Sequence, residues 1–197
     1  MGKRIFDVAL TLIAAPLVLV VVGVMATVLA IELRGSPFVV QERVGLNGKP
    51  FRMLKLRTMR HAEQGDERDR VITDWDTFVF APADQPDARI TRWGAFARRT
   101  SIDELPNLWN VLRGEMSIVG PRPEIPEIVL QYPERYHRRH DVLPGIAGLA
   151  QLNGRSDLTY DEIATYDLDY VDRHSMIIDL QILWRTVAIV LRGSGAR

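Results

Sequence analysis

The chain has 197 residues, a length that suits one domain with an ordinary hydrophobic core. It contains 25 basic and 25 acidic residues and no cysteine, so disulfides, thiolate metal sites and cysteine nucleophiles are excluded. The charge is uneven, because residues 1–60 hold nine Lys or Arg and three acids. Such a basic segment suits anionic partners, namely lipid headgroups, phosphates or nucleic acid.

The first element is an apolar run of 24 residues without a charge, at positions 8–31. About 20 residues are enough to span the core of a bilayer. A signal peptide fits poorly, because the run is too long and lacks a cleavage site with small residues. The run is also too long and too apolar for the buried helix of a soluble protein. It therefore predicts insertion into a membrane.

Two topologies fit this segment. Basic residues lie on both flanks, with Lys3 and Arg4 before the run and Arg34 after it, and positive charge favours the cytoplasmic side. Pro16 removes a helical hydrogen bond inside the run, and Thr11 or water would have to satisfy the freed carbonyl group. A break there gives a re-entrant helix with both ends on one face, whereas a kink gives a single span. Charge and proline alone do not separate the two.

Short strands are expected next. Residues 36–43 and 51–57 read as the two strands of a hairpin around a turn at 44–50. Residues 61–90 are polar and read as a surface loop, with a lid as one interpretation, anchored by Trp75, Phe78 and Phe80.

Helices account for most of the remainder. Residues 103–112 have helical spacing, and Gly114 follows as a stop signal. Further helices are expected at 127–139, 160–170 and 177–191, with an extended segment at 121–123 and a structured loop at 142–155. The last helix is apolar on most faces and carries Trp184, so we expect it at the membrane interface. The predicted fold is α-rich α+β with a short β-hairpin.

Asp103 and Glu104 are the candidate catalytic residues, and two readings compete for them. Ser101 followed three residues later by Glu104 matches a capping box, so both acids could simply complement a helix N-terminus. Taken in isolation, that structural reading is favoured. Arg98, Arg122 and Arg155, however, lie in turning segments near glycine or proline. Adjacent carboxylates with several arginines suit phosphoryl transfer, since a carboxylate can attack phosphorus or bind Mg²⁺ while guanidinium groups hold phosphate oxygens.

At this point the chain resembles the bacterial sugar transferase family, the monotopic phosphoglycosyl transferases. The motifs that carry the resemblance are KRIFD (3–7), KLRTM (55–59), TSIDELP (100–106), NVLRGEMSIVGPRPE (110–124) and PGIAGLAQLNGR (144–155). Together they extend the resemblance over residues 3–192.

The resemblance implies transfer of a sugar-1-phosphate from a UDP-sugar to polyprenyl (undecaprenyl) phosphate, as the first membrane step of polysaccharide or glycoconjugate assembly. Asp103 would attack the β-phosphorus, release UMP and carry the phosphosugar as a covalent aspartyl intermediate. Glu104 would bind the Mg²⁺ cofactor. Substrate-binding positions match Arg98, Arg122, Arg155, Lys55 and Arg57, and Asp167 matches a further acid of unassigned role.

The resemblance also implies a topology. Residues 1–35 would form a re-entrant membrane helix broken near Pro16, and residues 36–197 a catalytic domain with interfacial helices. The expected location is the inner membrane of a bacterium, with the site on the cytoplasmic face and membrane lipids as partners. We expect the short form of the family, without the extra N-terminal spans of longer members.

Two rival functions remain at this stage. One is a membrane-anchored binding module without activity, and the other is a glycosyltransferase that releases UDP. We expect no nucleic-acid partner, because no aromatic residues interleave the basic segment. The sugar, the lipid length and the oligomeric state, a homo-oligomer included, are not readable from the sequence.

Overall fold

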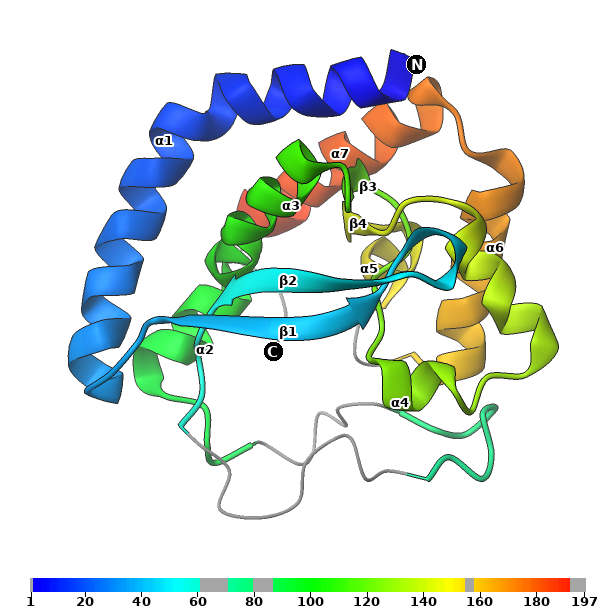
Figure 1. Cartoon of the computed structure of the whole chain (residues 1–197), viewed down its shortest axis with the longest axis horizontal. Coiled ribbons are helices and arrows are strands. Elements are labelled where there is room, and N and C mark those ends of the chain that lie inside the picture. Colours follow the sequence, from blue (N-terminus) through cyan, green and yellow to red (C-terminus); the bar gives the residue numbers. More distant parts are fainter. Residues whose placement is uncertain (1, 61–70, 80–86, 155–157, 192–197) are drawn as a thin grey trace.

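The computed structural model describes residues 2–60, 71–79, 87–154 and 158–191. Its longest element is helix α1 (Gly2–Leu33), which arches along the top and the left-hand side of the molecule in Figure 1. Within the described residues, α1 is the one helix long and apolar enough to cross a membrane, which confirms the predicted apolar element. Its outer side is exposed, and the buried positions are Asp7, Thr11, Met25, Ala26 and Leu29.

Helix α1 is continuous but changes direction between its two halves (Figure 1). Pro16 lies near the middle of its sequence and cannot donate a hydrogen bond to the preceding turn. The Thr11 hydroxyl is buried and has no hydrogen-bond partner among the described residues, so it does not satisfy the carbonyl group that Pro16 frees. A re-entrant path therefore stays a prediction, and the bend is the structural feature that agrees with it.

Strands β1 (Phe38–Val44) and β2 (Pro50–Leu56) form the predicted antiparallel hairpin, with Phe38 opposite Leu56 and Val44 opposite Pro50. The 3₁₀ helix η1 (Leu46–Gly48) makes the turn. Alternate side chains of β2 point into the core, as the strand period of two requires. That alternation buries the Lys55 side chain on the inner side of the hairpin.

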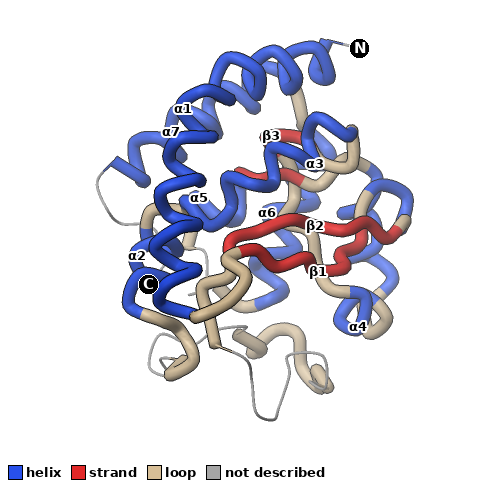
Figure 2. The backbone as a smooth tube through the Cα atoms, turned by 60° about the vertical axis from the view of Figure 1, so that its left-hand side comes forward, coloured by secondary structure: helices blue, strands red, loops and turns tan. Residues whose placement is uncertain are grey.

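A second, parallel pair of strands was not predicted. Strand β4 (Gly145–Ala147) lies in the region 142–155 that was expected to be a loop, and it pairs with β3 (Ser117–Val119). The short helix α5 (Leu149–Asn153) follows β4 in the same region. Three-residue strands are too short to show periodicity, so the loop prediction for 142–155 was wrong. Among the described residues the sheets are these two small pairs, and Figure 2 shows that helices dominate, which confirms the α-rich α+β class.

Of two predicted helices, one is continuous but changes type along its length, and the other is interrupted near a proline. Residues 103–112 form the 3₁₀ helix η3 (Ile102–Asn107), which contains Pro106, followed by α3 (Leu108–Arg113). The predicted stop at Gly114 is confirmed, with φ at 81° in the left-handed region. Residues 127–139, by contrast, are divided into α4 (Pro126–Val129) and the 3₁₀ helix η4 (Glu134–Asp141), because Pro133 cannot continue a helix.

The last two helices agree with the prediction. Helix α6 (Tyr160–Arg173) begins with a capping box from Thr159 and Glu162, and α7 (Met176–Leu191) follows almost directly. Of the predicted anchors in 61–90, Trp75 and Phe78 pack against a core cluster, whereas Phe80 lies outside the described residues. The segment 71–79 is thus fixed to the domain at these two rings.

Candidate active site

The candidate site lies in η3, which follows α2 (Arg92–Arg99) and precedes α3. Ser101 adopts a left-handed conformation with φ at 57°, and its side chain makes no capping hydrogen bond. The predicted capping box is therefore wrong. A left-handed serine is an uncommon, strained conformation, and such strain is often found at functional sites. The carboxylate of Glu104 contacts two cations instead of capping the helix.

Glu104 is held by two cations from distant parts of the chain. Its Oε1 lies 2.6 Å from Nη1 of Arg122 and 3.5 Å from Nζ of Lys55. Burial alone would raise the pKa of Glu104, but the charges of Arg122 and Lys55 outweigh it and lower that pKa to about 2. Glu104 is thus a permanent anion that orients two cations in the site.

Asp103 is half-buried and differs from its neighbour. Burial and the adjacent charge of Glu104 raise the pKa of the Asp103 carboxyl, against the opposing charges of Lys55, Arg122 and Arg98. Within the described part of the chain, this carboxylate accepts no hydrogen bond and forms no ion pair. It is therefore a carboxylate with unengaged oxygens, surrounded by positive charge, and it is free to contact an incoming group.

Lys55 supplies the buried amine of the site. Burial, reinforced by the charge of Arg122, lowers the pKa of Lys55 to about 8, although Glu104 acts in the opposite sense. The amine therefore changes charge close to physiological pH. Its side chain is only 11% exposed, which explains why water does not stabilise the charged form fully.

The other predicted substrate-binding residues are placed differently. Arg98 lies in the last turn of α2, where its charge acts on Asp103. Arg57 follows β2, and its Nε donates to the carbonyl oxygen of Met59 at 3.1 Å. Its guanidinium lies beside Gly35, so the described structure does not bring Arg57 to the dyad. Arg155 lies outside the described residues.

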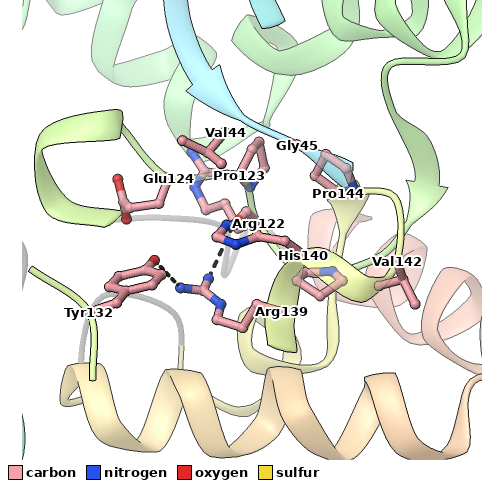
Figure 3. Close-up of a pocket in the computed structure, with 11 residues that line it drawn as sticks. Val44, Gly45, Arg122, Pro123, Glu124, Tyr132, Arg139, His140, Val142 and Pro144 are labelled. Atoms are coloured by element: carbon pink, nitrogen blue, oxygen red, sulfur yellow. Dashed lines mark hydrogen bonds between the residues drawn. The ribbon is translucent and has the colours of Figure 1, made fainter. Parts of the chain in front are cut away.

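The resemblance pointed to Asp167 without a role, but sequence reasoning missed the buried side chains beside it, among them Arg139 and Tyr132 (Figure 3). The guanidinium of Arg139 pairs with Asp167 at 2.7 Å, donates to the hydroxyls of Tyr132 and Tyr160 and donates to the carbonyl oxygen of Arg122 at 3.1 Å. Burial raises the pKa of Asp167 to about 6, although Arg139 acts against this. Arg139 lies in a run of basic residues at the end of the helix predicted at 127–139, and nothing in that run distinguishes a buried arginine from an exposed one.

The described structure thus combines a long apolar N-terminal helix, consistent with membrane association, with a carboxylate at Asp103 that is surrounded by the charges of Lys55, Arg122 and Arg98. The chain belongs to the bacterial sugar transferase family, whose family model matches residues 1–193.

Curated relatives cover the same region. The chain is 40% identical over 195 residues to an uncharacterized sugar transferase, EpsL, of Bacillus subtilis (strain 168), covering 98% of this chain and 89% of that protein. It is 39% identical over 207 residues to the UDP-glucose:undecaprenyl-phosphate glucose-1-phosphate transferase of Caulobacter vibrioides, covering 98% and 71%. It is 38% identical over 201 residues to the galactosyl transferase CpsE of Streptococcus agalactiae, with all of this chain matching 43% of the relative.

Proposed function

We propose that this chain is a phosphoglycosyl transferase that moves a sugar-1-phosphate from a UDP-sugar to undecaprenyl phosphate, in the initiation of an exopolysaccharide or a related glycoconjugate. The observation that carries the proposal is the pair Asp103 and Glu104. Among the described residues, the Asp103 carboxylate accepts no hydrogen bond and forms no ion pair, while Glu104 beside it contacts Arg122 and Lys55. Family membership and the name of the Caulobacter relative support the same reaction.

The proposed reaction has two displacement steps at one phosphorus atom. An oxygen of Asp103 attacks the β-phosphorus of the UDP-sugar, the bond from that phosphorus to the bridging oxygen breaks, and UMP leaves with the electron pair. A phosphate oxygen of the lipid then attacks the same phosphorus, and the Asp103 carboxylate is released as the polyprenyl diphosphosugar forms. Arg122, Lys55 and Arg98 neutralise the charge on the phosphoryl oxygens. Positions Arg57 and Arg155 remain predicted from the family resemblance.

The residues present fit a Mg²⁺ ion that is held mainly by the substrate. Mg²⁺ is commonly bound by one or two carboxylates together with substrate phosphates. The described residues contain no group of three or more metal-ligating side chains, so a complete protein cage is absent from this part of the chain. Arg122 and Lys55 both contact Oε1 of Glu104, and we propose the second carboxylate oxygen, Oε2, as the protein ligand. The ion would neutralise diphosphate charge.

We further propose that the site works on the cytoplasmic face of the bacterial membrane, with α1 as a re-entrant anchor and α7 at the interface. Helix α7 exposes an apolar side formed by Ile177, Leu180, Trp184 and Val187. Trp184 is 77% exposed, and tryptophan is enriched at the level of lipid headgroups.

Intact-mass spectrometry tests the chemistry. Purified full-length protein is incubated with Mg²⁺ and UDP-glucose, UDP-galactose or UDP-N-acetylgalactosamine, without lipid. We expect UMP release and a hexose-phosphate adduct that Asp103→Asn abolishes. Release of UDP would support a glycosyltransferase, and no turnover of any donor would support a binding module. The same panel identifies the sugar.

Cysteine labelling tests the topology independently. In intact cells, a membrane-impermeant thiol reagent should fail to label either Gly2→Cys or Ser36→Cys, and both should react once the cytoplasmic side is opened. Labelling of the two positions from opposite sides would contradict the re-entrant path while leaving the chemistry untouched.

A further inference from the structure

Arg122 lies between two prolines, which limits the hydrogen bonds that the backbone around it can form with other elements. Pro121 and Pro123 have no N–H group, so this segment cannot donate hydrogen bonds at those positions. The segment keeps one backbone N–H, that of Arg122, and three carbonyl oxygens, so its backbone forms hydrogen bonds mainly as an acceptor. A buried carbonyl normally requires a donor, so the donors that reach this segment determine where Arg122 stands.

Each of the three consecutive carbonyl oxygens accepts a hydrogen bond from a different element. The oxygen of Pro121 accepts from the backbone N–H of Gly145 in β4 at 2.8 Å. The oxygen of Arg122 accepts from Nη2 of Arg139 in η4 at 3.1 Å, and that of Pro123 accepts from Nη1 of Arg43 in β1 at 3.4 Å. Figure 3 shows the Arg139 guanidinium pointing at the backbone of Arg122.

The Arg139 side chain is itself rigidly placed. It is 4% exposed, and its partner Asp167 in α6 is 1% exposed. The same guanidinium donates from Nη1 to the hydroxyls of Tyr132 at 2.5 Å and Tyr160 at 2.7 Å. A planar fork can serve these partners simultaneously, whereas the single ammonium of lysine cannot.

From these contacts we infer that Arg139 is a positioning residue for the reaction: by holding the Arg122 carbonyl, it places the Arg122 guanidinium against Glu104 beside the nucleophile. The inference rests on the proposed function for its kinetic test. It assigns Asp167 as the counter-ion that keeps the Arg139 fork in place, a role that the family resemblance left open.

A purely structural role for the buried pair is the alternative. In that case Arg139 and Asp167 stabilise the packing of η4 on α6, and any loss of activity reflects loss of folded protein. The two roles separate in a single-turnover experiment, because misfolding lowers the amplitude of phosphosugar–enzyme formation while misplacement lowers its rate constant.

The principal variant is Arg139→Lys, which keeps a positive charge for Asp167 but loses the fork. Wild type and variant are mixed with Mg²⁺ and whichever radiolabelled donor the wild type uses, UDP-glucose or UDP-galactose, and adduct formation is followed by rapid quench. We expect a fall of about 10²-fold in the rate constant, the size associated with misplacement of about 1 Å, at near wild-type amplitude. Arg135→Gln, on the same element, removes an exposed ion pair with Asp161 and should leave the rate constant unchanged.

The charge-neutral pair Arg139→Gln with Asp167→Asn provides the second variant. It leaves no unpaired buried charge, so the folded amplitude should be retained while the rate constant stays low. A wild-type rate constant in both Arg139→Lys and this pair would overturn the inference.

A readout without turnover decides the inference even if no donor reacts. Thermal unfolding is compared for Arg139→Lys, Glu104→Gln and the double variant. If Arg139 acts through Arg122 on Glu104, the double variant should lose at least about 2 °C less than the sum of the two single losses, because residues in one network do not contribute additively. Strict additivity, as expected for Arg139→Lys with the distant Glu32→Gln, would overturn it. Failure of the wild type to form an adduct would instead count against the proposed function.

Discussion

The carboxylate of Asp7 in α1 accepts a hydrogen bond from the hydroxyl of Ser117 at 2.8 Å, although the two residues are 110 positions apart. The same carboxylate accepts the backbone N–H of Ile118 at 3.2 Å. Both Asp7 and Ser117 are buried, at 1% and 0% exposure. The first half of α1 is thus bonded to β3, the strand that leads into the Arg122 segment.

Removing the Ser117 hydroxyl should destabilise the protein. Ser117→Ala leaves a buried carboxylate oxygen without its partner, which costs about 1–3 kcal/mol. The unfolding midpoint of purified protein in detergent should fall by about 2–4 °C for each kcal/mol. Ser36→Ala is the matched control, because the Ser36 hydroxyl bonds only to the backbone of Phe38 two residues away and is exposed, so water can replace it and the loss should be smaller than for Ser117→Ala. Equal midpoints for the two variants would show that the Asp7 contact contributes nothing.

The two acids of the dyad should respond differently to neutralisation. Asp103→Asn should abolish the phosphosugar adduct yet keep or slightly raise the unfolding midpoint, because it removes a carboxylate that Glu104 repels. Glu104→Gln should slow adduct formation and lower the midpoint, since Arg122 and Lys55 then repel one another. Adduct mass and differential scanning fluorimetry on the same samples measure both. A lower midpoint for Asp103→Asn than for Glu104→Gln would contradict this electrostatic description.

Adduct formation should depend on pH in two limbs. The rate should fall as pH rises through about 8, because Lys55 loses the proton that neutralises phosphate charge. It should also fall in acid, as the Asp103 carboxyl with its raised pKa becomes protonated. Lys55→Arg stays charged, so its alkaline limb should move far above pH 8 while its acid limb remains. An alkaline limb at the same pH in wild type and Lys55→Arg would exclude Lys55 as its origin.

Gly145 should tolerate no side chain. A Cβ atom added there would lie 2.0 Å from the backbone nitrogen of Gly120, and neither backbone can move away without separating β3 from β4. Gly145→Ala should therefore cost at least about 1–3 kcal/mol, the usual cost of overpacking. Gly23→Ala in α1, with nothing within 4 Å, should be neutral or slightly stabilising. Thermal unfolding of the two variants gives the comparison.

The parts of the fold that could be predicted are those with long, regular patterns. The apolar run of α1, the alternation in β1 and β2, and the spacing in α6 and α7 are visible in the sequence. Strands of three residues have no such pattern, and Pro133 precedes a 3₁₀ helix that is separate from α4 although the spacing over 127–139 looks continuous.

The residues of the candidate site likewise fall into those that the sequence predicted and those that it did not. Asp103, Glu104, Lys55, Arg98 and Arg122 were predicted, and the structure gathers them. Arg139 could not be found, because its burial depends on tyrosines in other segments and on an acid 28 residues further along. The one sequence feature that pointed to a supporting residue was the proline on either side of Arg122. Prolines lack an N–H group, so this segment is held through its carbonyl oxygens by donors from other elements.

The second half of α1 packs into the interior of the domain, where Met25, Ala26 and Leu29 share a cluster with Leu56 and Ala97. Removing the residues before β1 to obtain a water-soluble fragment would therefore remove part of this hydrophobic cluster. It would also expose the packed face of α2, the helix that carries Arg98. Detergents or nanodiscs that preserve α1 are for this reason a requirement for handling the folded enzyme, and its anchor and its interior cannot be engineered separately.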